Sequence, residues 1–145
     1  IFHDLKVHTF NVSPNLEKTL IGKDEWYFVA GKEVDIFEGE LNFSDESLKK
    51  FESEWYERKL YLDSMGIKYH WIICPFKHNI YPEKLPYSVS KRNNEKRVDQ
   101  LKNHLNSIFP NLIIDPSQEL IEAKDSNEVF YHLDNHWNYY AGYIT

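Results

Sequence analysis

Strand-like apolar runs alternate with helical segments along most of this chain, and that alternation limits the fold more than any other feature. Residues 26–30 form an apolar and aromatic run between two glycines, which predicts a strand. Residues 45–65 carry large apolar side chains at helical spacing behind Ser44, a residue suited to cap a helix. Residues 67–76 are mostly β-branched or aromatic and predict a central strand buried on both faces.

The second half of the chain continues this alternation. It predicts a helix over 90–109, a short strand over 112–114, a short helix over 117–124, a strand over 129–133 and the start of a helix over 137–144. Such an order favours an α/β fold, in which helices flank a largely parallel sheet. Residues 1–21 are weakly patterned and predict an irregular lead-in, whereas residues 22–145 contain no repeat or linker and predict one domain.

The composition excludes several classes of protein. A net charge of −6 argues against a general nucleic-acid-binding protein, which needs a basic face. No apolar run approaches the roughly 18 residues that a membrane-spanning helix needs. Cys74 is the only cysteine, so neither an intrachain disulfide nor a cysteine-based zinc site is predicted, and no cofactor is expected. Aromatic residues make up 16% of the chain, and their faces suit stacking on sugar rings.

Asp134 and His136 follow the predicted strand at 129–133, and α/β domains place their sites at the carboxyl ends of strands. If the strand alternation continues, both side chains project to the same side, and the carboxylate orients the imidazole as a general base. That chemistry also needs a nucleophilic Ser or Cys. A rival interpretation adds His132 and makes the alternating triplet a divalent-metal site. Alternate strand residues lie about 6.6 Å apart and form a poor facial triad, so no metal is assigned, but this alternative stays open.

Four blocks of sequence within residues 22–145 occur in the same order as in a known family. They read GKDEWYFVAG at 22–31, DIFEGE at 35–40, GIKYHWIICPFKHNIYPEKLP at 66–86 and FYHLDNHWNYYAGY at 130–143. Together they resemble the alginate O-acetyltransferase family, with its AlgX- and AlgJ-like SGNH domains and its DHHW-type relatives. The chain departs from the family pattern at Asn135, which replaces a Thr, and at Glu25, which replaces a common Gly. The resemblance implies an SGNH-hydrolase-like layered fold with a mostly parallel sheet flanked by helices.

The same resemblance implies an O-acetyltransferase that modifies hydroxyl groups of an exported polysaccharide. Its chemistry would use a Ser-His-Asp triad and an acetyl-enzyme, with His136 as the base and Asp134 as the residue that orients it. The side chains expected to contact substrate are Lys77, Tyr81, Trp137 and Asn138.

The loop after residue 76 has two interpretations. By resemblance it lies near the site, where Lys77 would bind an anionic donor or a uronate. A plainer alternative makes Lys77 a solvated side chain and packs Tyr81 against Pro82. Arg97, on the predicted second helix, is expected to form a structural salt bridge.

The nucleophile of the family lies in a Gly-Asp-Ser-Phe type of block, and no such block occurs in this chain. Asp63–Ser64 closes a predicted helix and Asp125–Ser126 occupies a predicted turn, so neither serine is interpreted as the nucleophile. We therefore expect the chain to be the N-terminal part of a longer catalytic domain and to be inactive without the missing serine.

The resemblance also implies partners and a location. The expected partners are a polysaccharide acceptor and an acetyl donor, with a membrane-bound O-acyltransferase as a candidate supplier and no nucleic acid. The domain is expected outside the cytoplasm, in the periplasm or at the cell surface, attached to a membrane only through an N-terminal anchor outside this chain. Two alternatives stay open: a carbohydrate acetylesterase of the same fold, and a non-catalytic carbohydrate-binding or scaffold domain.

Overall fold

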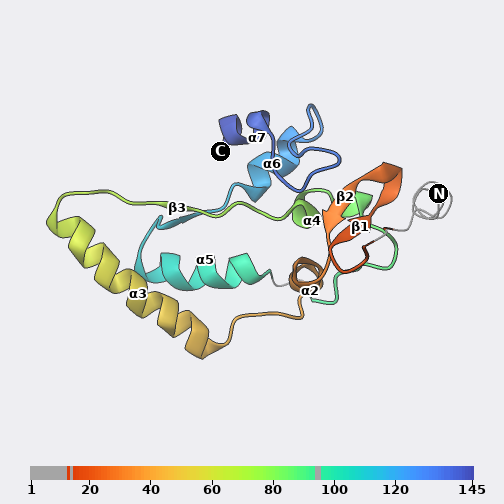
Figure 1. The fold of residues 1–145 in the computed structure, drawn as a ribbon. Helices are drawn as coiled ribbons and strands as arrows, with labels where there is room; N and C mark the ends of the chain where they lie inside the picture. Colours follow the sequence, from red (N-terminus) through yellow and green to blue (C-terminus); the bar gives the residue numbers. More distant parts are fainter. Residues whose placement is uncertain (1–12, 14, 94–95) are drawn as a thin grey trace.

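The computed structural model of the protein describes residues 13, 15–93 and 96–145 (Figure 1). The chain begins its regular structure with an antiparallel hairpin, in which β1 (Thr19–Ile21) pairs with β2 (Tyr27–Val29). The predicted strand at 26–30 is therefore confirmed as β2. β1, however, lies in the segment where an irregular lead-in was expected, because β2 supplies a partner for its backbone that the sequence pattern does not reveal.

The hairpin turn is a short 3-10 segment, η1 (Lys23–Glu25), with an unusual backbone. Asp24 and Glu25 both adopt left-handed conformations, with φ of 53° and 60°. Gly22 precedes them, and a Cβ atom at Gly22 would overlap the carbonyl oxygen of Lys84. A glycine is therefore required at residue 22 by the close approach of a distant loop.

The longest helix agrees with its prediction. α3 (Asp45–Ser64) begins after Ser44, whose side chain accepts a hydrogen bond from the backbone N–H of Ser47 at 3.2 Å. This bond satisfies one of the amide groups that a helix start leaves without a partner. A further helix, α2 (Lys32–Glu38), precedes it and was not predicted.

The predicted central strand at 67–76 is wrong in length and in burial. Only β3 (Trp71–Ile72) forms a strand, and it pairs in parallel with β4 (Ile113–Ile114). The side of β3 away from β4 has no strand partner among the described residues, and Ile72 is 48% exposed. The described part of the chain thus contains two two-stranded sheets, one parallel and one antiparallel, rather than a mostly parallel sheet.

The remaining elements are helices and turns. They are α4 (Lys77–Ile80), η2 (Pro82–Lys84), α5 (Arg97–Ile108), α6 (Ser117–Ala123) and α7 (Tyr139–Ile144). The helices predicted at 117–124 and 137–144 are confirmed as α6 and α7. The helix predicted at 90–109 is confirmed only over α5, since residues 90–93 and 96 are not helical and residues 94 and 95 lie outside the described part of the chain. The predicted strand at 129–133 is wrong, since only an isolated bridge between Phe130 and Trp137 forms there.

Two hydrophobic clusters organise these elements. The first joins the hairpin, α4, α6 and α7 through side chains that include Trp26, Phe28, Ile80 and Phe130. The second lies between α3, α5 and the β3–β4 pair, at the opposite end of the molecule in Figure 1. The first cluster therefore supports the C-terminal loop that carries Asp134 and His136. Across the described residues, no helix has both the length and the apolar character needed to cross a membrane.

Candidate active site

The segment that carries the predicted catalytic pair is a closed loop between Phe130 and Trp137. The backbone N–H of Tyr131 donates to the carbonyl of His136 at 3.1 Å, and the N–H of Asn138 donates to the carbonyl of Val129 at 3.0 Å. These bonds fasten the two ends of the loop together on top of the first hydrophobic cluster. The loop replaces the predicted strand end as the element that positions the pair.

Asp134 and His136 are in direct contact within this loop. One carboxylate oxygen of Asp134 accepts the backbone N–H of His136 at 2.8 Å and lies 2.6 Å from the imidazole Nδ1 of the same residue. A carboxylate accepts hydrogen bonds only, so Nδ1 carries the hydrogen and Nε2 is left as the basic nitrogen. The predicted pairing thus occurs, through a tight side-chain turn rather than through strand alternation.

The electrostatics of the pair favour an ionised carboxylate. The backbone N–H of His136 is the largest influence that lowers the pKa of Asp134, followed by the bond from its imidazole. Both side chains lie at the surface, at 83% exposure for His136 and 57% for Asp134. The pair is therefore accessible to another group that approaches from solvent.

His132 does not join this pair. Its Nε2 donates to the carbonyl oxygen of Asp24 at 2.7 Å, and its ring stacks on Trp26 with centroids 4.8 Å apart. No group of three or more His, Cys, Asp or Glu side chains arranged to hold a metal ion is found in the described part of the chain. The metal-site alternative built on alternating residues fails because the strand that would align those residues does not form.

Lys77 occupies a place that the sequence did not suggest. Its side chain is completely buried, and its amino group donates to four backbone carbonyl oxygens at 2.8–3.0 Å, those of Tyr27, Tyr131, His132 and Asp134. The amino group also lies over the rings of Trp26 and Phe28, at 4.7 and 5.2 Å. One buried cation therefore ties β2 to the loop of the catalytic pair.

The environment of Lys77 does not agree with the predicted contact to an anionic substrate, nor with a solvated side chain. Burial lowers the pKa of Lys77 to about 8, against an opposing effect of the nearby Asp134 carboxylate. All three N–H donors of the ammonium are directed at backbone carbonyls, so none remains for a ligand. Lys77 positions the loop that carries the pair.

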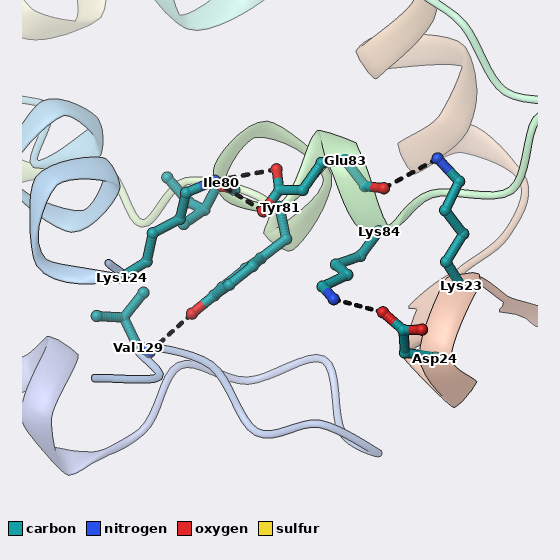
Figure 2. Close-up of polar contacts among 8 residues, drawn as sticks. All are labelled: Lys23, Asp24, Ile80, Tyr81, Glu83, Lys84, Lys124 and Val129. Atoms are coloured by element: carbon teal, nitrogen blue, oxygen red, sulfur yellow. Dashed lines mark hydrogen bonds and ion pairs between the residues drawn. The ribbon is translucent and has the colours of Figure 1, made fainter. Parts of the chain in front are cut away.

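Tyr81 is also a buried, structural residue. Its hydroxyl oxygen accepts the backbone N–H of Val129 at 3.0 Å (Figure 2), and its ring lies 4.3 Å from that of Trp26. Burial is the main cause that raises the pKa of Tyr81. The predicted substrate contact stays a prediction, as does the alternative packing against Pro82, and the contact observed for the ring is with Trp26.

Figure 2 shows that the loop around Tyr81 connects segments that are far apart in the sequence. Lys124 donates to the carbonyl of Ile80 and to the carboxylate of Glu83. Lys84 forms an ion pair with Asp24 in the hairpin turn. The loop thereby holds the hairpin and the segment after α6 against each other. Through Tyr81 and Val129 the loop also contacts the segment that leads to Asp134 and His136.

Trp137 and Asn138 likewise have structural contacts. Trp137 is partly buried against the first hydrophobic cluster. The side-chain oxygen of Asn138 accepts the N–H of Ala141 at 3.0 Å and caps α7, while its amide nitrogen donates to the carbonyl of Glu128. Their predicted roles in substrate binding stay predictions, and the contacts observed are those of a helix cap and a packed ring.

A nucleophile for His136 is not found among the described residues. No serine or cysteine in the part of the chain that the structure describes hydrogen-bonds to its imidazole. Ser64 donates instead to the carbonyl of Tyr61 at the end of α3, and Ser126 lies in the turn after α6. Their positions agree with the interpretation that neither is the nucleophile.

Comparison with known proteins identifies a family whose model matches most of the sequence. The model of a family described as an SGNH hydrolase-like domain of the acetyltransferase AlgX matches residues 19–145. No curated protein matches the chain, and no solved structure matches it. The match begins at β1 and includes the hairpin, the loop around Tyr81 and the loop of Asp134 and His136.

Proposed function

The chain belongs to the SGNH hydrolase-like family of the acetyltransferase AlgX, and we propose that it contributes the His and Asp of a Ser-His-Asp triad for O-acetylation of an exported polysaccharide. The observation that carries this proposal is the 2.6 Å contact between Asp134 Oδ1 and His136 Nδ1. It leaves Nε2 exposed and basic, as a general base must be.

The proposed reaction has two steps. In the first, Nε2 of His136 takes the proton of a seryl hydroxyl while the seryl oxygen attacks the acetyl carbonyl, and the donor departs with that proton. In the second, a sugar hydroxyl gives its proton to Nε2 and attacks the acetyl-serine, and Nε2 passes that proton to the departing seryl oxygen. Asp134 keeps the imidazole in one orientation and stabilises its charged form in both steps. The serine is proposed to come from polypeptide outside these 145 residues.

The surface beside the pair supports a carbohydrate acceptor. α7 starts directly after the loop and exposes Tyr139 and Tyr143, which are 91% and 87% accessible. Residues four apart lie on the same face of a helix, so the two rings stand side by side. Exposed aromatic faces stack on sugar rings, and the acidic chain favours a neutral or cationic glycan over alginate.

Partners and location are part of the same proposal. A membrane-bound O-acyltransferase would supply the acetyl group, and the domain would work on the outer side of the cytoplasmic membrane, held by an N-terminal anchor. An acetylesterase would use the same pair, with water in place of the sugar hydroxyl in the second step.

Activity of the full-length protein that carries the serine tests the proposal. With p-nitrophenyl acetate as donor, His136→Ala is expected to lower the rate of acetyl transfer by at least about 100-fold, the usual contribution of a general base. His104→Ala is the matched control, because His104 also pairs with a carboxylate, that of Glu52, at 2.9 Å. Equal rates for the two variants would refute a catalytic role for His136.

The 145-residue chain allows an independent test of the pair itself. Imidazole ¹⁵N shifts are expected to show the Nδ1–H tautomer of His136 at neutral pH. Asp134→Asn keeps an oxygen that accepts the backbone N–H of His136 but removes the charge, so the tautomer population should shift toward Nε2–H. An unchanged tautomer population in Asp134→Asn would mean that the carboxylate does not orient the ring.

A further inference from the structure

A cavity lies away from the catalytic pair. A cavity of about 360 Å³ opens between α2, β3, the start of α4 and the start of α5. Neither Asp134 nor His136 lines it, and no residue of α7 does. Its volume is at the small end of the range for ligand sites, which suits a compact organic molecule.

The walls of this cavity are apolar. They are formed largely by Phe43, Phe51, Trp71, Ile73, Phe76 and Leu101. Phe43 and Phe51 meet edge to face with ring centroids 5.4 Å apart, so this wall is a packed aromatic surface. An apolar ligand body would therefore replace water at the wall without leaving a polar group of the wall unsatisfied.

The charged residues that the structure describes around the cavity are all positive. Lys91, Lys96 and Arg97 line it, and none of the described residues around it is an Asp or a Glu. This is a reversal of charge in a chain whose net charge is −6. Three cations around an apolar hollow favour a ligand that combines an apolar body with a negative head.

Arg97 gives the most specific indication of the ligand's head group. Its guanidinium lies 4.1 Å from the centre of the Phe43 ring, and its Nε is buried with no hydrogen-bond partner. By contrast, Arg92 pairs with the carboxylates of Glu38 and Glu40. Among the described residues the salt bridge predicted for Arg97 does not form. Arg97 therefore brings to the cavity a positive charge that no carboxylate of the described residues pairs with.

We propose that this cavity binds a small amphipathic carboxylate, with the apolar body against the aromatic wall and the carboxylate at Arg97. The guanidinium lies over the ring of Phe43, and its terminal amino groups can donate charge-assisted hydrogen bonds to a carboxylate. Lys91 lies over the ring of Phe37 at 5.5 Å and adds positive charge at the same rim. This site is independent of the acetyl-transfer chemistry proposed above.

Cys74 provides a direct reporter of occupancy. It lines the cavity and is the only cysteine in the sequence, so the rate of thiol labelling reports on a single position. Sodium octanoate at ten times its dissociation constant is expected to slow labelling of Cys74 by about tenfold, because only the free protein reacts. Acetate has the same head without the body, and octylammonium has the same body with the opposite charge, so neither should protect Cys74.

Substitution of Arg97 tests the role of the head group. Arg97→Met keeps an apolar contact with Phe43 and is expected to weaken octanoate binding by about tenfold or more, the effect of losing one charge-assisted contact. Arg58→Met is the matched control, because Arg58 also lies over an aromatic ring, that of Trp55 at 5.1 Å, and does not line the cavity. Circular dichroism confirms that each variant is folded.

Three results would overturn the proposal. The first is a labelling rate of Cys74 that octanoate leaves unchanged. The second is protection of Cys74 by octylammonium equal to that by octanoate, and the third is a folded Arg97→Met protein that binds octanoate as the native protein does. The first two comparisons use the native chain alone, so they decide the matter even where the Arg97 variant does not fold.

Discussion

The amino group of Lys77 lies 3.0 Å from the backbone carbonyl oxygen of Asp134, so a buried cation supports the loop that carries the candidate base. The same amino group donates to the carbonyl of Tyr27, which precedes Asp134 by more than a hundred residues. The position of the Asp134–His136 pair therefore depends on a completely buried lysine. This one side chain links the geometry of the loop to the stability of the fold.

Replacing Lys77 should destabilise the protein strongly. Lys77→Met keeps most of the apolar volume but removes the donor that four part-buried carbonyl groups share, although the carbonyl of His132 keeps the backbone N–H of Tyr27. The loss should cost about 3 kcal/mol in the free energy of unfolding. Urea unfolding followed by tryptophan fluorescence measures this change. Lys68→Met is the control, since Lys68 is exposed. If both variants lose the same stability, Lys77 does not hold the loop.

The stability of the protein should fall in mild acid because of His78. This side chain is completely buried, its Nε2 donates to the carbonyl of Val29 at 2.9 Å, and burial lowers its pKa from 6.5 to about 4. Between these values the unfolded chain binds a proton that the folded chain does not. The free energy of unfolding should therefore decrease by about 3 kcal/mol as the pH falls from 6.5 to 4.

His78→Gln isolates this contribution. Glutamine does not titrate, and its amide nitrogen can still donate to the carbonyl of Val29. The decrease in stability between pH 6.5 and 4 should become smaller by the same amount in this variant. His70→Gln, at an exposed position, should keep the native pH dependence. A pH profile unchanged by His78→Gln would contradict the assignment.

Asn138 should contribute to stability in two separable ways. Its oxygen caps α7 and its amide nitrogen bonds to the carbonyl of Glu128. Asn138→Ala loses both contacts and should cost about 1–2 kcal/mol, whereas Asn138→Asp keeps the cap and should cost less. Thermal unfolding monitored by circular dichroism ranks the three proteins. Equal losses in the two variants would show that the cap contributes nothing.

Glycine at residue 25 should stabilise the protein. Glu25 has a φ of 60°, a conformation that costs an L-residue about 1 kcal/mol and a glycine almost nothing. Glu25→Gly should therefore raise the free energy of unfolding by up to about 0.5 kcal/mol, after allowance for the greater freedom of glycine in the unfolded chain. Glu25→Ala keeps the strain and should give no such gain. Calorimetry on both variants distinguishes relief of strain from removal of the charge.

The helices were largely predictable because their signals are local. α3 follows from the capping residue Ser44 and from large side chains at helical spacing, and the structure confirms it over Asp45–Ser64. The contact of Asp134 with His136 was also predictable, because the two residues are only two positions apart. The local structure that forms this contact was not predictable, since a turn rather than a strand brings the carboxylate to the imidazole.

The strands were poorly predictable for a physical reason. An apolar run such as 67–76 becomes a buried strand only where neighbouring strands pair with it, and the described residues offer one short partner, β4. Glu25 is a related case. The sequence shows there only a departure from the family's glycine, whereas the backbone adopts a conformation that favours glycine.

The sequence by itself determined the family, the main helices and the adjacency of the carboxylate and the imidazole. Only the tertiary structure decided that Lys77 and Tyr81 are buried supports and that Arg97 faces an apolar cavity. The physical reason is distance along the chain. The partners of Lys77 are carbonyl groups of residues 27, 131, 132 and 134, and side-chain identities carry no information about where backbone oxygens from such separate segments converge.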